Sequence, residues 1–358
     1  MSGKITYLLG AGASVDALPT VLEVPERFAI FLRILQKCIY QDESYNETIK
    51  KFINKGHEFY DALCNNTSFD SYARLLYKIK HIKEFELDFI LFKQYIGLYF
   101  LFEQLPNKQI ELLYEREIGE EILSIPSEIE NKLEKEIDNR YPAFLSEFFD
   151  FKTDTLDSNV NIISWNIDSQ LELAYKQYNK SISFDKIQEK LKIYPSKLVS
   201  ANNAQIIKLN GTAGSHLENS GDKTSFFSRS YTDATKVYKS IAESFDFSSQ
   251  LTPQFYFAWE KENPFKDAAI NRAKRILSES NIIVIVGYSF QRPNIEIDKI
   301  LFSHDNMYNK KYYFQVLEED FITYREKLKI LVPNIVHVGD KHIEYISSLR
   351  EFYVPYNF

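Results

Sequence analysis

The sequence predicts a doubly wound α/β fold, in which a parallel sheet is covered by helices, together with a large helical insertion. Three observations lead to this prediction. Short apolar runs alternate with amphipathic segments along most of the chain. The runs are almost continuously apolar, as in parallel strands that helices cover on both faces. Small or polar residues follow the runs at once, at the place where open parallel sheets bind ligands.

The first predicted strand spans residues 5–9 and leads directly into a run of small residues. This run contains Gly10, Ala11, Gly12 and Ser14. Glycines permit a tight turn, and small side chains allow backbone N–H groups to face a phosphate. The third glycine of a complete dinucleotide-binding fingerprint is absent. A plain strand-to-helix turn is therefore the alternative interpretation of this loop.

Residues 26–155 interrupt the alternation and predict a helical insertion subdomain. They contain few strand-like runs and several stretches with helical periodicity. Residues 1–25 and 156–358 then form the sheet domain. Within the insertion, residues 111–140 are rich in charge. We interpret them as a solvated helical face, with a partner-binding surface as the alternative.

Three later segments repeat the pattern of an apolar run that ends in polar or small residues. We expect all of these ends to lie at the same edge of the sheet as the glycine loop, because the strands are predicted to be parallel. The segments are 161–175 with Asn166 and Asp168, 205–216 with Asn210, and 281–298 with Gly287 and Ser289.

The alternation of strands and helices continues to the end of the chain. We predict a helix over 267–280, a strand over 312–316, a helix over 318–332, a last strand over 334–338 and a closing helix over 342–352.

Composition limits the classes of function. The chain has 358 residues, of which 44% are apolar and 26% charged, and its net charge is −7. It has no basic stripe, so we expect no direct contact with nucleic acid. No apolar run approaches the length of about 18 residues that a membrane span needs. Cys38 and Cys64 are the only cysteines; we therefore expect no thiolate metal site and a reduced, cytoplasmic setting.

Four short motifs together resemble the sirtuin-like superfamily. They are Gly-Ala-Gly-Ala-Ser at 10–14, Trp-Asn-Ile-Asp at 165–168, Lys-Leu-Asn-Gly at 208–211 and Gly-Tyr-Ser-Phe at 287–290. The motifs occur in the family's order and span nearly the whole chain. The resemblance implies a Rossmann-like domain that binds NAD. It places the phosphates on the glycine loop, the nicotinamide ribose beside Asn166 and Asp168, and the adenosine half on the loop that contains Gly287 and Ser289.

The chain departs from the classical protein deacylases of this family in two ways. Two cysteines cannot form the family's four-cysteine zinc module, and the long helical insertion instead resembles bacterial antiphage members that hydrolyse NAD. The family also has a His-Gly pair, whose histidine is the usual general base, where this chain has Asn210 and Gly211. His216, six residues further on, is a candidate replacement for that base, although a solvated histidine is the plainer interpretation.

The residue types fit cleavage of the bond between ribose and nicotinamide. Positive charge develops on the ribose in such a reaction. An ionised Asp168 can stabilise this charge, and Asn166 can orient the water or the ribose hydroxyls. Asn210 is no base, although it can still position the ribose. Each residue has a plainer alternative: a helix cap for Asp168, Ser14 and Ser289, and a turn residue for Asn166.

The leading functional hypothesis is therefore an NAD hydrolase that acts as a toxic effector of bacterial antiphage defence. Because unrestrained NAD hydrolysis would kill the host, we expect a protein regulator, or activation by homo- or hetero-oligomeric assembly. A catalytically silent NAD or nucleotide sensor is the second hypothesis, and Asn210 favours it. A protein deacylase and a purely structural interaction protein are more distant alternatives.

The polar segment 211–235, which follows Asn210, is either a loose connection or a mobile flap.

Overall fold

The computed structural model describes residues 3–39, 46–66, 68–85, 87–104, 135–217, 223–225, 252–261, 263–338 and 340–355. Most of the charge-rich segment 111–140 and most of the polar segment 211–235 lie outside these ranges. In the second segment, the described residues Gly211–Leu217 and Lys223–Ser225 form two paired strands rather than a loose connection. The described chain divides into two compact units. The first comprises Met1–Val15, Asp138–Thr212 and Tyr256–Phe358, and the second comprises Asp16–Ile137 and Ala213–Phe255.

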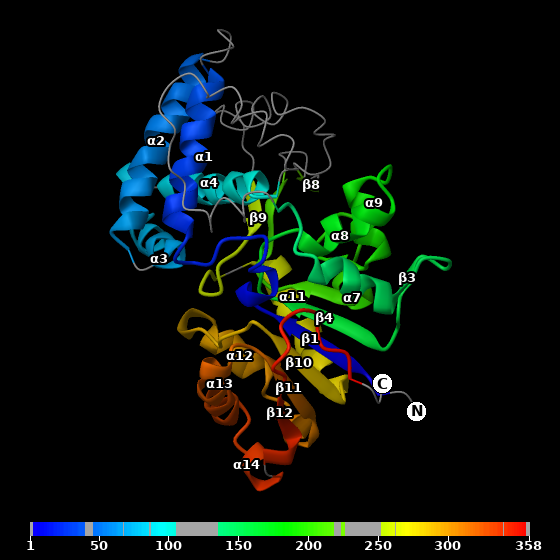
Figure 1. Cartoon of the computed structure of the whole chain (residues 1–358). Helices are drawn as coiled ribbons and strands as arrows, with labels where there is room; N and C mark the ends of the chain where they lie inside the picture. The colour runs from blue at the N-terminus through cyan, green and yellow to red at the C-terminus, as the bar shows by residue number, and fades with distance from the viewer. Residues whose placement is uncertain are drawn as a thin grey trace. The chain divides into compact units, whose positions relative to one another are not determined.

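The first unit is built on a parallel sheet of seven strands, which confirms the predicted fold class (Figure 1). The order across the sheet is β12-β11-β10-β1-β4-β6-β5, so the first strand of the chain lies at the centre. The strands are β1 (Ile5–Leu9), β4 (Val160–Ser164), β5 (Ile193–Tyr194), β6 (Ile206–Lys208), β10 (Ile282–Val286), β11 (Lys311–Gln315) and β12 (Ile343–Tyr345). A separate two-stranded ribbon pairs β2 (Phe149–Asp150) with β3 (Thr155–Leu156).

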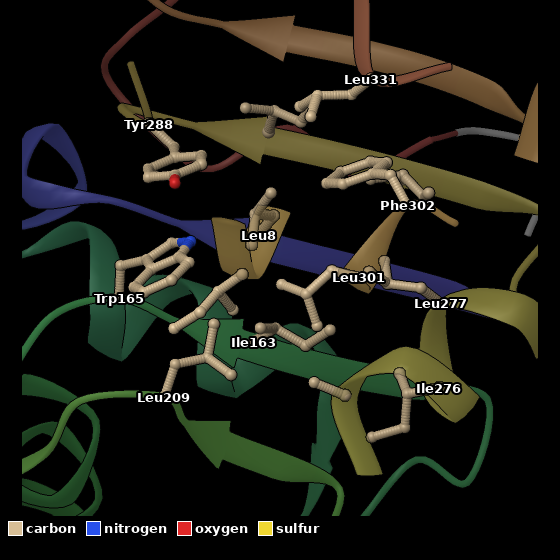
Figure 2. Close-up of a cluster of buried hydrophobic side chains, with 14 of the residues drawn as sticks. Leu8, Ile163, Trp165, Leu209, Ile276, Leu277, Tyr288, Leu301, Phe302 and Leu331 are labelled. Atoms are coloured by element: carbon tan, nitrogen blue, oxygen red, sulfur yellow. The ribbon is translucent and has the colours of Figure 1, made fainter. Parts of the chain in front are cut away.

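Helices pack on both faces of this sheet, because alternate side chains of its buried strands point to opposite faces. On one face, Leu8 of β1 belongs to a large apolar cluster with residues of α11, α12 and α13 (Figure 2). On the other face, the ring of Tyr7 packs edge-on against Phe144 of α7, with 4.7 Å between the ring centroids. The helices of this unit are α7 (Arg140–Phe148), α8 (Gln170–Tyr178), α9 (Phe184–Lys190), α11 (Pro264–Glu279), α12 (Ile295–Leu301), α13 (Glu318–Leu331) and α14 (Ile335–Val338).

In its described residues, the second unit combines four α-helices with a small sheet. The helices pack around buried aromatic rings; Phe52 and Tyr95, for example, stack with 4.1 Å between their centroids. The sheet has the order β8-β7-β9. The elements are α1 (Val24–Ile39), α2 (Asn46–Cys64), α3 (Phe69–Ile79), α4 (Asp88–Phe102), β7 (Gly211–Leu217), β8 (Lys223–Ser225) and β9 (Thr252–Phe255). Among the described residues, no helix is both long enough and apolar enough to cross a bilayer.

The end of the chain differs from the prediction. Residues 334–338 were expected to form the last strand, but Ile335–Val338 is the short helix α14. The last strand is β12, within the segment 342–352 that was expected to be a helix. Short apolar runs of this length do not distinguish a strand from a buried helical turn. In α14, Ile335 is buried while Val336 is 61% exposed, so only one side of the run faces the core.

Candidate functional site

Four neighbouring strands of the sheet end at the same level. Leu9 at the end of β1 lies opposite both Val286 of β10 and Ser164 of β4, and Ser164 lies opposite Lys208 of β6. The loops that follow these strands therefore emerge together at the carboxyl edge of the sheet. The chain leaves β1 for neighbours on both sides, so this edge is also a topological switch point, the place where open α/β sheets bind ligands.

The glycine loop after β1 is in direct backbone contact with the loop after β10. A Cβ atom on Gly10 would lie 2.6 Å from the carbonyl oxygen of Gly287, and a Cβ on Gly12 would lie 2.8 Å from the Cα of Gly287. Gly287 itself has φ +55°, and a Cβ there would lie 2.4 Å from Gly12. The small residues are therefore required by the close approach of another loop of the same chain.

Backbone acceptors already occupy three amides of this loop. The N–H of Gly10 donates to Val286 O at 3.0 Å, that of Gly12 to Gly287 O at 3.1 Å, and that of Ala13 to Gly10 O at 2.9 Å. Ala11, at the start of the short 3-10 helix Ala11–Ser14, is exposed. The contact between the loops explains both glycines without a ligand, and the phosphate-binding role of Gly10, Ala11 and Gly12 stays a prediction.

Ser14 lies at the centre of a buried hydrogen-bond cluster. Its Oγ donates to Asp168 Oδ2 at 2.8 Å and accepts from Asn166 Nδ2 at 3.2 Å. The hydroxyl of Tyr141, in the first turn of α7, lies 2.9 Å from the same Oγ. Ser14 is the last residue of the short 3-10 helix Ala11–Ser14. It therefore does not cap the N-terminus of that helix, which was the alternative interpretation of this serine. The structure thus brings together three of the predicted site residues.

Asp168 is buried at the end of the loop between β4 and α8. Its Oδ1 accepts from the N–H of Gln170, the first residue of α8, at 3.1 Å, whereas the N-cap position itself is Ser169. Burial raises the pKa of the carboxyl group, while the charge of Lys208 and the hydrogen bonds from Gln170 and Ser14 act to lower it. The net effect is a pKa above that of a free aspartate, with burial as the largest cause.

Asn166 joins the glycine loop to this cluster. Its side-chain Nδ2 donates to Gly10 O at 2.9 Å as well as to Ser14, and its backbone N–H donates to Ser164 Oγ at 3.0 Å. Both donating positions of the side chain are therefore directed into the protein. The carbonyl oxygen Oδ1 of this half-buried side chain is left to accept a hydrogen bond from a water or a sugar hydroxyl.

Asn210 follows β6 and turns toward the loop that contains Asn166. Its Nδ2 donates to Trp165 O at 2.9 Å, and its backbone carbonyl accepts from the N–H of Tyr256 at 2.7 Å. Its Oδ1 is buried and has no hydrogen-bond partner among the described residues, and the same holds for the indole Nε1 of Trp165. Trp165 stacks on Tyr288 at one end of the apolar cluster, with 5.7 Å between centroids (Figure 2).

A buried ion pair beneath the site was not predicted. Lys208 Nζ lies 2.7 Å from Glu172 Oε1 and donates to the backbone carbonyl of Asp168 at 2.7 Å. Both side chains are at most 2% exposed. The available signals were a lysine at the end of an apolar strand and a glutamate one helical turn after Asp168, the spacing of neighbours on one helix face.

Arg140 is a further residue of the site that the sequence did not reveal. Its guanidinium is paired with Asp138, and its Nη2 donates to the carbonyls of Gly12 and Ala13, both at 3.2 Å. It therefore holds the glycine loop from the side of α7. Arg140 and Tyr141 come from a segment that sequence analysis assigned to the helical insertion, so nothing in the sequence linked them to this loop.

The loop after β10 contains the remaining predicted residues. The carbonyl of Ser289 accepts from Lys327 Nζ at 2.7 Å. The hydroxyl of Tyr288 donates to both carboxylate oxygens of Asp298, at 3.0 and 2.8 Å. Asp298 is fully buried, and burial raises its pKa to about 7. Gly287 contacts the glycine loop directly, whereas nothing in the structure tests an adenosine-binding role for Gly287 or Ser289.

His216 lies in β7, opposite Thr224 of β8, and its side chain is outside the described part of the structure. Its role as a replacement base stays a prediction. Among the described residues, no three histidine, cysteine, aspartate or glutamate side chains are grouped so that they could hold a metal ion.

The solved structures that this chain resembles include sirtuins at low sequence identity. No family model and no curated protein matches the chain. Sir2Tm bound to a propionylated peptide is 14% identical with a TM-score of 0.36, over 98% of this chain and 90% of that one. A Sir2 homologue mutant in complex with ADP-ribose is 12% identical with a TM-score of 0.34, over 94% and 93%. A sirtuin solved to explain substrate affinity is 16% identical with a TM-score of 0.33; the match covers 60% of this chain and 66% of that protein.

Proposed function

We propose that this chain is an NAD glycohydrolase that cleaves NAD to nicotinamide and ADP-ribose. The observation that carries the proposal is the hydrogen-bonded cluster of Ser14, Asn166 and Asp168 at the switch point of a parallel sheet. These residues come from two of the four motifs that resemble sirtuin-like proteins. The cluster combines a buried carboxylate, an open amide oxygen and a contact with the glycine loop, which are the groups that such a cleavage needs.

The chemistry requires few groups from the protein. The C–N bond between ribose and nicotinamide breaks, and nicotinamide leaves as a neutral molecule with the bonding electrons. A water oxygen forms the new C–O bond, and its proton passes to solvent. Asp168, when ionised, stabilises the positive charge that develops on the ribose. Asn166 Oδ1 is the group left to accept from the attacking water or from a ribose hydroxyl.

The purified full-length chain tests this proposal through the release of nicotinamide from NAD. We expect Asn166→Ala to lower turnover by roughly 10²-fold or more, since the amide orients a reacting group. Asn202→Ala is the matched control, because Asn202 is an exposed asparagine that bonds only to Arg275 Nη2 among the interactions of its side chain that the structure describes. Turnover of Asn166→Ala at the wild-type rate would remove Asn166 from catalysis. No turnover by any assembled form of the wild type would contradict the hydrolase itself.

A silent NAD sensor is the second candidate, and Asn210 is the observation that favours it. An asparagine amide is not a base, so Asn210 cannot take a proton from water, and its Nδ2 already donates to Trp165 O. We expect Asn210→His to raise NAD hydrolysis by about 10²-fold, which is within the usual contribution of a positioned base. NAD binding by calorimetry without turnover in either form would favour the sensor. Pairing the change with His216→Ala shows whether His216 already serves as the base.

We further propose that the hydrolase is a toxic effector of bacterial antiphage defence that a protein partner or assembly activates. Two arguments support this role. The long helical insertion resembles that of bacterial antiphage members that hydrolyse NAD, and unrestrained NAD hydrolysis would kill the host cell, so the activity needs a trigger. Measurement of cellular NAD in bacteria that express the chain, with and without phage infection, tests it. Equal NAD levels under both conditions would contradict an effector role.

A further inference from the structure

Tyr141 belongs to the cluster around Ser14 but has no part in the chemistry proposed above. Its side chain is 1% exposed, and its ring packs edge-on against Phe352 with 5.1 Å between centroids. Its hydroxyl lies 2.9 Å from Ser14 Oγ, which lies 2.8 Å from Asp168 Oδ2. A continuous chain of hydroxyl groups therefore connects a buried tyrosine to the carboxylate of the site.

The direction of this chain follows from the number of protons. Ser14 has one hydroxyl proton and donates it to Asp168, which can only accept when it is ionised. The two lone pairs of Ser14 Oγ then accept from Asn166 Nδ2 and from the hydroxyl of Tyr141. Tyr141 is therefore the donor as long as Asp168 carries its charge. A protonated Asp168 would instead be able to donate to Ser14, and the direction of the hydrogen bonds from Tyr141 to Asp168 would no longer be fixed.

We propose that Tyr141 is a positioning residue that acts on Asp168 through Ser14. By donating to Ser14 it holds the serine as a donor to Asp168, and it thereby favours the ionised carboxylate. Its effect on turnover rests on the proposed NAD hydrolysis, whereas its effect on the ionisation of Asp168 does not.

We expect the other groups around Asp168 to stay in place when the hydroxyl of Tyr141 is removed. Lys208 at the end of β6 and Glu172 in α8 are the charged groups that face Asp168 from those elements. On the side of α7, the charges nearest to Tyr141 are Asp138 and Arg140, which are paired with each other. Replacement of Tyr141 by phenylalanine keeps the ring and all of these charges, so the change isolates the hydroxyl.

The test is the pKa of Asp168 in the full-length chain, measured by NMR with ¹³C-labelled aspartate in wild type and Tyr141→Phe. We expect the pKa to rise by about 0.5 to 1 unit, because one bond of a charge-assisted chain is lost. If the chain hydrolyses NAD, the acidic limb of its pH–rate profile moves upward by the same amount. Tyr7→Phe is the matched control: it also removes a buried hydroxyl, which bonds Tyr353 O at 2.9 Å, and should leave Asp168 unchanged.

Two further measurements keep the result decisive. In a Ser14→Ala background, Tyr141→Phe should no longer shift the pKa of Asp168, because the connecting group is gone. Site-specific 3-fluorotyrosine at position 141 should lower that pKa, since a more acidic phenol is a stronger donor. An unchanged pKa in Tyr141→Phe, or an equal shift in the Ser14→Ala background, would overturn the proposal. Absence of NAD turnover in wild type would refute only the proposed function, because the titration does not depend on activity.

Discussion

Two buried aspartates lie beyond the strands on either side of β1, and their surroundings differ. Asp168, beyond β4, accepts hydrogen bonds from the N–H of Gln170 and from Ser14, and the charge of Lys208 acts on it. Asp298, in α12 beyond β10, accepts from the neutral hydroxyl of Tyr288. Burial raises the pKa of both carboxyl groups, that of Asp298 to about 7.

The comparison shows that burial alone does not decide what a carboxylate can do. The carboxylate of Asp168 accepts hydrogen bonds from two separate elements, and the charge of Lys208 beneath it also acts to lower its pKa, so three groups favour the ionised form. Asp298 has a neutral hydroxyl and, at longer range, the charge of Lys327, which acts to lower its pKa. We therefore expect Asp168 to serve the reaction and Asp298 to support the Tyr288 ring, which stacks on Trp165.

We expect the largest loss of stability when the buried ion pair beneath Asp168 is broken. Lys208→Ala removes the cation from a buried pair and leaves Glu172 with the side-chain amide of Gln188 as its remaining described partner. An uncompensated buried charge of this kind costs about 3–5 kcal/mol. Denaturant unfolding at pH 7 should show that loss in the free energy of unfolding, and NMR should show a higher pKa for Asp168.

The control for this prediction is an exposed pair of the same composition. Lys299 and Glu296 lie 2.9 Å apart on the surface of α12, with side chains 58% and 78% exposed. Lys299→Ala should change the free energy of unfolding by less than about 1 kcal/mol. Equal effects of the two substitutions would contradict a structural role for the buried pair.

The next largest loss of stability is expected at the contact between the loop after β10 and the loop after β1. Gly287 begins the loop that leads to Tyr288, and it touches Gly12 in the loop that leads to Ser14. Gly287→Ala adds a Cβ at a positive φ against backbone atoms, so we expect a loss of about 2–4 kcal/mol. Gly3→Ala is the control, since its new Cβ would meet Asn281 at 3.4 Å, an ordinary contact. A Gly287→Ala chain as stable as wild type would show that the loops can separate freely.

Much of this arrangement could be predicted from sequence because it depends on strand periodicity. Continuous apolar runs such as 282–286 indicate buried parallel strands, and the residues that follow such strands must lie at one edge. That reasoning placed Asn166 and Asp168 near the glycine loop, and the structure joins both of them to Ser14.

The groups that support the site could not be predicted in this way. Arg140 and Tyr141 approach from a helix that is distant in sequence from both the glycine loop and the strands, so no local pattern links them. The pairing of Lys208 with Glu172 depends on how β6 and α8 pack, which periodicity does not reveal. The contact of Gly10 and Gly12 with the backbone of Gly287 could not be predicted either, because it depends on how the loops after β1 and β10 pack.

The smallest expected effect is the pH dependence of stability that Asp298 causes, and it tests how the two aspartates differ. Because the pKa of Asp298 is about 7 in the folded chain and about 3.9 when unfolded, the folded state binds the proton more tightly and stability falls as pH rises between these values. Asp298→Asn keeps an acceptor for Tyr288 but cannot ionise. Between pH 5 and pH 7, wild type should therefore lose about 2 kcal/mol of stability relative to the variant. Parallel pH dependence of unfolding in both chains would show that Asp298 is already ionised at pH 5, and its surroundings would then resemble those of Asp168.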